Sequence, residues 1–194
     1  MLHPLSACRR AFTLIELLIV VAIIAVLAAI AVPNFLEAQT RSKVSRAKAD
    51  MRTIATAMES YRTDYNRYPL HRLPTNALIL PVVQRFAVLS TPIAYLSSIP
   101  NDPFFVGRVD LATWGTPTYD YWSYNPAFAY GPKRGTYWLV ESRGPDRVKS
   151  LATATAPNGA VWDYAIPYDP TNGTMSAGDL AISNTGFLGM RDVQ

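Results

Sequence analysis

Residues 17–32 read LLIVVAIIAVLAAIAV, an unbroken aliphatic run, and no charged residue occurs from Leu17 to Leu36. A helix of that length is about 30 Å long at 1.5 Å per residue, which matches the hydrocarbon core of a bilayer. A helix also satisfies its own backbone hydrogen bonds, which lipid cannot do. The run therefore predicts a membrane-spanning helix, with a buried core helix as the alternative.

The flanks of the run predict its orientation. Arg9 and Arg10 lie just before it, and basic residues next to a membrane span tend to stay in the cytoplasm. The N-terminus is then cytoplasmic, and the residues after about position 37 lie outside. We expect a single-pass protein of the inner (cytoplasmic) membrane with an extracytoplasmic C-terminal domain.

The composition narrows the class of protein further. Of the 194 residues, 49% are hydrophobic and 16% are charged, which is too apolar for a disordered chain. A single cysteine, Cys8, cannot form an intrachain disulfide. The formal net charge is only +4, and no window concentrates cations with aromatic residues. Nucleic acid is therefore not an expected partner.

Residues 9–18 read RRAFTLIELL. This stretch resembles the signal of the type IV prepilins and of the type II secretion pseudopilins. The resemblance implies that a prepilin peptidase cuts between Ala11 and Phe12 and that the new amine of Phe12 is methylated. Glu16 is then the fifth mature residue. Ala11 stands where the family usually has Gly.

The resemblance implies a role in assembly for Glu16 and Pro33. The Glu16 carboxylate of one subunit meets the Phe12 ammonium of a neighbour inside a filament, and such a pair favours one register because any other leaves a buried charge alone. Interfacial placement near lipid headgroups is the alternative account of Glu16. Pro33 predicts a kink or local melting of the helix, since it removes a backbone donor.

The same resemblance implies the partners. They are further copies of the chain in a filament, the prepilin peptidase, an inner-membrane platform protein, an assembly ATPase and other, minor pseudopilins, together with the membrane. Cleavage before Phe12 removes Cys8 and leaves no cysteine, which is closer to the type II secretion pseudopilins than to the many pilins closed by a disulfide.

Other N-terminal signals remain as alternatives. Residues 5–8 read LSAC, which is similar to a lipobox ending in Cys8. Residues 9–12 have a twin-arginine pattern, and residues 29–31 fit a signal-peptidase site. With either signal the chain would be an exported or membrane-anchored binding domain or enzyme.

Residues 37–67 are amphipathic and contain eleven charged residues without Pro or Gly. Apolar residues recur at a spacing of three and four, which predicts a continuing helix with one face buried against a sheet or, alternatively, in a coiled coil. These residues are Val44, Ala47, Met51, Ile54, Met58, Tyr61, Tyr65 and Tyr68. Tyr68-Pro69 ends the helix, and Asn66 is its expected left-handed cap.

Strands are predicted further on. Residues 119–124 and 136–142 are rich in aromatic and β-branched residues and predict an antiparallel pair, with a third strand near 161–166. A helical turn is expected around residues 82–89. The predicted fold is α+β and pilin-like, with a long N-terminal helix packed on a small antiparallel sheet with long irregular loops. Its parts are a leader (1–11), a transmembrane and assembly helix (12–36), an amphipathic helix (37–69) and a sheet and loop region (70–194).

Two loops resemble those of the major pseudopilins. Residues 100–104 read PNDPF, similar to the family's Pro-x-Asp-Pro-Phe/Trp segment. Residues 142–146 read SRGPD, similar to its Ser-x-Gly-Pro-Asp-Gly loop, which often holds calcium. Arg147 replaces the final Gly. Asp146, Asp169 and Asp179 are the candidate calcium ligands, and ordinary turn hydrogen bonds are the alternative.

Enzymatic chemistry has no positive support in the sequence. His3 and His71 are the two histidines, and His3 lies in the predicted leader. No nucleophile with its base, no phosphate-binding glycine loop and no zinc spacing is recognisable. We therefore predict a structural subunit of a type II secretion pseudopilus or a type IV pilus-like filament, not an enzyme.

Overall fold

The structure is a computed structural model of the chain. It describes residues 12–71, 73, 77–107, 117–123, 138–148, 151–155, 161–165, 168–169, 178–184 and 186–187. The chain divides into two compact units, residues 1–39 and 40–194.

Helix α1 (Leu14–Tyr65) contains 52 residues and runs unbroken through Pro33, so the local melting expected there is not found in this structure. The helix ends a few residues before Tyr68-Pro69. Asn66 has a φ of 53° and donates its N–H to the Arg62 carbonyl at 2.7 Å. Asparagine tolerates this left-handed conformation, and the predicted cap is confirmed.

The second half of α1 buries one stripe of side chains. The buried residues are Val44, Ala47, Met51, Ile54, Ala57, Met58 and Tyr61. They recur every three or four positions, as predicted, and charged residues occupy the other faces. Tyr65 was predicted to continue the stripe, but it is 40% exposed and stacks on Tyr61 instead.

The main sheet has four antiparallel strands in the order β1-β2-β5-β6. Their bounds are β1 (Asp120–Ser123), β2 (Trp138–Ser142), β5 (Leu180–Ser183) and β6 (Gly186–Phe187). The predicted pairing of the first two strands is confirmed, with Tyr121 opposite Val140. On its other side β2 pairs with β5, where Val140 lies opposite Ile182. Strand β5 was not predicted from the sequence.

A separate two-stranded sheet consists of β3 (Leu151–Thr155) and β4 (Val161–Ala165). The strand predicted near residues 161–166 is therefore present. It pairs antiparallel with β3, however, and belongs to a different sheet from β1 and β2.

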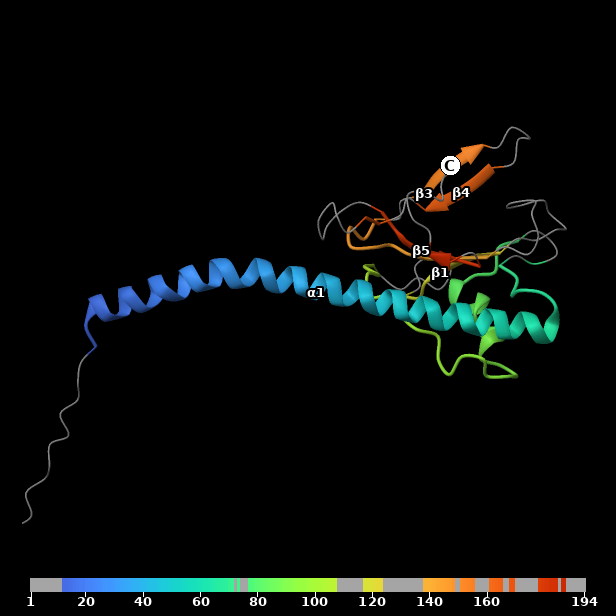
Figure 1. The fold of residues 1–194 in the computed structure, drawn as a ribbon, viewed down its shortest axis with the longest axis horizontal. Helices are drawn as coiled ribbons and strands as arrows, with labels where there is room; N and C mark the ends of the chain where they lie inside the picture. Colours follow the sequence, from blue (N-terminus) through green and yellow to red (C-terminus); the bar gives the residue numbers. More distant parts are fainter. Residues whose placement is uncertain are drawn as a thin grey trace, which may run out of the picture. The chain divides into compact units, whose positions relative to one another are not determined.

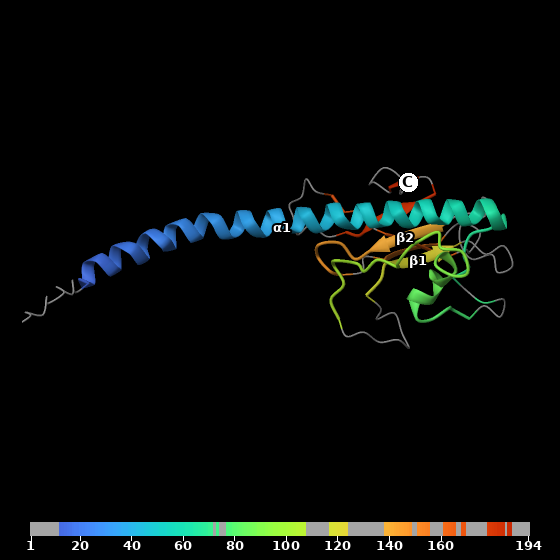
Figure 2. The ribbon, with the colours of Figure 1, turned by 90° about the horizontal axis from the view of Figure 1, so that it is seen from below.

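The core lies between the second half of α1 and the main sheet (Figures 1 and 2). Tyr121, Trp138, Val140 and Ile182 alternate along the strands and join the helix stripe in one buried cluster. The residues between them, such as Leu139 and Ala181, belong to a smaller cluster. The alternation follows from the period of two in a strand. The helix stripe thus packs on a sheet and not in a coiled coil.

Polar contacts fix the helix on the sheet. The Glu59 carboxylate accepts hydrogen bonds from the Tyr68 hydroxyl at 2.7 Å and from the Trp138 indole N–H at 3.1 Å. The Tyr119 hydroxyl donates to Asp50 at 3.0 Å. Burial, reinforced by the nearby Asp50 charge, raises the pKa of Tyr119, so its hydroxyl remains a donor at neutral pH.

The connection between α1 and β1 contains two short 3₁₀ helices, η1 (Val82–Arg85) and η2 (Ala87–Leu89), where a helical turn was predicted. Arg85 is fully buried. Its Nε donates to the Ile79 carbonyl at 2.9 Å, and its Nη1 donates to the Tyr121 carbonyl at 2.7 Å. Nη1 also pairs with the Asp120 carboxylate at 3.2 Å. One guanidinium therefore joins the connection to β1.

Replacing Arg85 by methionine should lower the free energy of unfolding by about 3 kcal/mol, because the variant leaves carbonyls and a carboxylate without their buried donor. Guanidinium unfolding of the detergent-solubilised full chain, followed by near-ultraviolet circular dichroism, measures the change. Gln84→Met is the matched control, since Gln84 is the exposed neighbour in η1. Equal stability of the two variants would contradict the role assigned to Arg85.

Candidate functional site

The first candidate site is the N-terminus of α1. The Thr13 hydroxyl accepts the backbone N–H of Glu16 at 3.3 Å, and the Glu16 carboxylate accepts the backbone N–H of Thr13 at 2.9 Å. The Thr13 hydroxyl also donates to the same carboxylate at 2.8 Å. This reciprocal arrangement is a capping box, in which side chains satisfy backbone donors that the helix leaves free. It gives Glu16 partners within its own chain.

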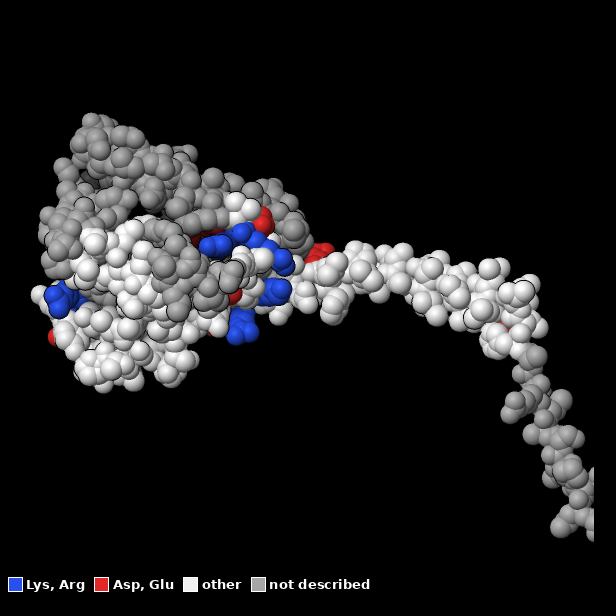
Figure 3. Space-filling view, turned by 180° about the vertical axis from the view of Figure 1, so that it is seen from behind, with Lys and Arg blue, Asp and Glu red and all other residues white. Residues whose placement is uncertain are grey.

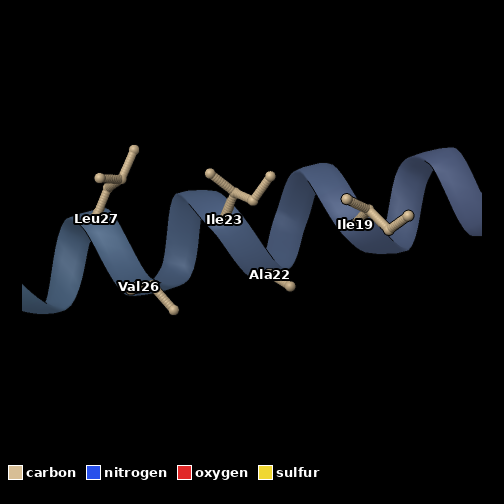
Figure 4. A pocket seen from close by; sticks show the side chains of 5 residues that line it. All are labelled: Ile19, Ala22, Ile23, Val26 and Leu27. Carbon is tan, nitrogen blue, oxygen red and sulfur yellow. The ribbon is translucent and has the colours of Figure 1, made fainter.

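An apolar surface follows directly on this cap. Every Leu, Ile, Val and Phe from Leu14 to Leu36 is at least 46% exposed within the chain. Figure 4 shows part of this surface: Ile19, Ile23 and Leu27 follow one another along one side of the helix, and Ala22 and Val26 along another. Apolar surface of this extent in water would be strongly unfavourable, so it requires lipid or other apolar helices around it.

Within the part of the chain that the structure describes, one helix, α1, is long and apolar enough to cross a membrane, and the window responsible has no residue buried inside the protein. A signal sequence, or the core helix of a soluble protein, can also have this length and composition. The absence of burial argues against the core helix. A membrane anchor is the interpretation that fits an uncovered apolar helix.

The predicted assembly residues lie on or beside this helix. Phe12 precedes its first turn and is 71% exposed. Glu16 lies in that first turn, and Pro33 lies within the continuous helix. Ala11, the residue before the predicted cleavage point, lies outside the described residues. Thr13, which binds Glu16, was missed as a site residue, although the Thr-x-x-Glu spacing is a recognisable sequence signal.

The second candidate site is the loop after β2. The loop contains a turn in which the Arg147 N–H donates a hydrogen bond to the Gly144 carbonyl at 3.1 Å. Asp146 accepts the N–H of Val148 at 3.1 Å and that of Gly178 at 3.3 Å. The loop is therefore held against the segment that leads into β5. Arg147 has a φ of 61°, a left-handed conformation that costs a non-glycine residue about 1 kcal/mol.

The structure shows hydrogen bonds at two of the three candidate calcium ligands, Asp146 and Asp179. Both Asp146 oxygens accept backbone hydrogen bonds, which is the turn chemistry proposed as the alternative. The carbonyl of Asp179 accepts the N–H of Tyr168, next to Asp169. Among the described residues, no three His, Cys, Asp or Glu side chains come together to hold a metal ion. Calcium binding by Asp146, Asp169 and Asp179 therefore stays a prediction.

A buried carboxylate that was not predicted as a site residue anchors the same loop. Asp102 accepts the Ser142 hydroxyl at 2.9 Å, the Phe104 N–H at 2.9 Å and the Arg143 N–H at 3.3 Å. Burial raises the pKa of Asp102, and these three hydrogen bonds oppose that increase. Residues 100–104 were recognised only as a family-like turn. The structure shows that this turn fixes the end of β2.

The fold and the first site together define a class of protein. A capped apolar helix with no cover in its own chain, followed by an amphipathic half that packs on a small antiparallel sheet, is the architecture of a pilin-like subunit. Residues 6–32 match the family model of the prokaryotic N-terminal methylation motif.

Residues 34–146 match the model of type II secretion system (T2SS) protein G, which covers more than half of the chain. The chain belongs to that family. The membership agrees with the prediction of a structural protein that is not an enzyme.

Individual relatives support both matches. The chain is 30% identical over 139 residues to the type II secretion system core protein G of Escherichia coli, which covers 71% of this chain and 83% of the relative. It is 31% identical over 132 residues to that of Pectobacterium carotovorum, covering 64% and 76%. The type IV major pilin protein PilA of Myxococcus xanthus is 56% identical over 60 residues, covering 31% of this chain and 27% of the relative. No solved structure matches the chain.

Gly144→Ala should destabilise the second unit by about 2 kcal/mol. Gly144 has a φ of 67°, and a Cβ there would lie 2.2 Å from the Gly178 carbonyl oxygen, so the loop and the segment before β5 would have to separate. Gly107→Ala is the control, because the nearest atom to its Cβ is a side-chain carbon at 3.7 Å. Thermal unfolding of both variants tests the difference, and a Gly144→Ala midpoint equal to that of the control would contradict it.

Proposed function

We propose that this chain is a filament-forming subunit of a type II secretion pseudopilus, assembled through the first half of α1. The observation that carries the proposal is a carboxylate, Glu16, held at the start of an apolar helix that the rest of the chain does not cover. Membership of the protein G family and the methylation motif support it.

Glu16 has to be accommodated in two states. In the isolated subunit, the Thr13 N–H and hydroxyl satisfy the carboxylate, which reduces the cost of keeping it beside lipid. Cleavage before Phe12 leaves an ammonium group at the N-terminus of every subunit that enters the filament. We infer that Glu16 then exchanges its Thr13 partners for the Phe12 ammonium of a neighbour, and that this ion pair fixes the register.

The uncovered apolar face supplies the attraction between subunits. Side chains such as Ile19, Ile23 and Leu27 lie along one side of α1 at a spacing of four residues, so helices that associate through this side can interdigitate. The axial position is then set by Glu16 and not by the aliphatic residues, because similar aliphatic side chains repeat along the helix and can interdigitate in more than one register.

The membership in a secretion family implies partners in a secretion machinery. We propose the specific set to be the prepilin peptidase, an inner-membrane platform protein, an assembly ATPase and minor pseudopilins. We also propose that the unassembled subunit crosses the inner membrane once, with its N-terminus in the cytoplasm and the residues after about position 37 outside. Pro33 is proposed to be the position where α1 loosens once subunits pack together.

Glu16→Gln should reduce incorporation of the subunit into filaments at least tenfold, while membrane insertion remains normal. Glutamine at this position can still complete the capping box but carries no charge for the neighbour's ammonium. Sheared-filament yield and membrane fractionation in the native host measure the two properties. Glu37→Gln on the same helix is the control. Normal filaments from the Glu16 variant would exclude the ion pair as the determinant of register.

The subunit isolated from its host should begin at Phe12 and carry one methyl group on the new amine. Intact-mass and N-terminal peptide mass spectrometry check both features. Retention of Met1, a start at Val32 or lipid on Cys8 would each contradict the proposed processing and would favour one of the other N-terminal signals.

A further inference from the structure

Basic residues are concentrated in the part of α1 that follows the apolar run. From Arg41 to Arg52 the chain has five basic residues and a single acidic one, Asp50. The basic residues are Arg41, Lys43, Arg46, Lys48 and Arg52. The net charge of this segment, +4, equals that of the whole chain. Figure 3 shows most of the visible Lys and Arg side chains in one area of the molecular surface, with others apart from them at the left edge.

Packing on the sheet fixes the rotation of this segment. Val44, Ala47 and Met51 are buried in the core, so the basic residues between them occupy the remaining faces. Arg41 and Arg46 are exposed and Lys43 is half-buried. Burial in the core therefore does not fix these three side chains, and Arg41 also interacts electrostatically with Tyr168.

Distance along α1 separates the basic residues into two groups. Arg41, Lys43 and Arg46 lie about 7, 10 and 15 Å beyond Leu36 at the helical rise, whereas Lys48 and Arg52 lie about 18 and 24 Å beyond it. The headgroup layer of one leaflet is about 5–8 Å thick, and physiological salt screens charges beyond about 8 Å. Only the first three residues are within reach of lipid headgroups.

The direction of helical side chains adds to this reach. The Cα–Cβ bonds of an α-helix tilt toward its N-terminus, which here is the side of the apolar run. Long Lys and Arg side chains can therefore extend back toward the membrane surface while their aliphatic carbons remain along the helix. The same tilt would carry basic residues that precede a span away from it.

Existing partners do not hold Arg46 firmly. Its Nε lies 3.8 Å from the Asp50 carboxylate, at the outer limit for an ion pair, and its side chain is 71% exposed. Asp50 also accepts the Tyr119 hydroxyl. Exposed pairs of this kind contribute little stability, and a basic residue four positions before an acidic one is the weaker orientation. A phosphate can accept two hydrogen bonds from one guanidinium and is the stronger partner.

We propose that Arg41, Lys43 and Arg46 form a basic collar that binds the phosphates of anionic phospholipids on the membrane face where α1 emerges. The inference rests on the membrane placement proposed above. The collar holds the unassembled subunit at one depth in the bilayer. Acidic side chains of a second copy are the competing partner, but headgroups lie beside these residues in every unassembled subunit.

The test uses the full chain in nanodiscs made of equal parts phosphatidylcholine and phosphatidylglycerol. Native mass spectrometry of the released protein counts the lipids that stay bound. We expect about tenfold preferential retention of phosphatidylglycerol, lost in Arg41→Gln/Lys43→Gln/Arg46→Gln. The control Lys48→Gln/Arg52→Gln/Arg62→Gln removes three cations farther along the same helix and should keep the preference.

Equal lipid retention by the wild type and the collar variant would overturn the inference. So would a collar variant that keeps the lipid preference but fails to enter filaments, since the surface would then face a second copy. Thermal unfolding of each variant verifies that the fold is intact. Because lipid retention requires no polymerisation, a wild-type chain that retains phosphatidylglycerol preferentially but forms no filaments would contradict the proposed function and leave the collar standing.

Discussion

The structure depends on one constraint: α1 is a single helix whose two halves require different surroundings. The first half has no polar face, and each of its exposed Leu or Ile side chains would gain about 1.5–3 kcal/mol by leaving water. The second half has a single apolar stripe, which one layer of sheet can cover. The small sheet of this chain matches the stripe and leaves the apolar half for lipid or for other helices.

The features that the sequence predicted correctly are those set by local pattern. The apolar run, the three-four stripe from Val44 to Tyr61 and the aromatic strands β1 and β2 each show a periodicity that packing then uses. Asn66 was predictable for the same reason, because a left-handed cap depends on the residue type at one position. The prepilin signal is also local, since it consists of contiguous residues.

The features that were missed depend on contacts between distant segments. Strand β5 is four residues long and carries no strong pattern, yet it pairs with β2 from about forty residues away. Arg85 looks like an ordinary surface residue until its guanidinium is found on the Tyr121 carbonyl. Asp102 was recognised as a turn residue, but its partner Ser142 could not be known without the fold.

The capping box bears on how a filament could choose its register. At its own helix start, the Glu16 carboxylate has hydrogen bonds and the favourable end of the helix dipole. In the proposed filament, a neighbour must therefore offer more than neutral donors, and a Phe12 ammonium would offer a full opposite charge. The free energy that selects the register is then the difference between two satisfied states, which is smaller than the cost of a bare buried carboxylate. A small difference would allow a misplaced subunit to return to its own Thr13 partners and dock again, so the contact that stabilises the free subunit in lipid would also keep the proposed assembly correctable.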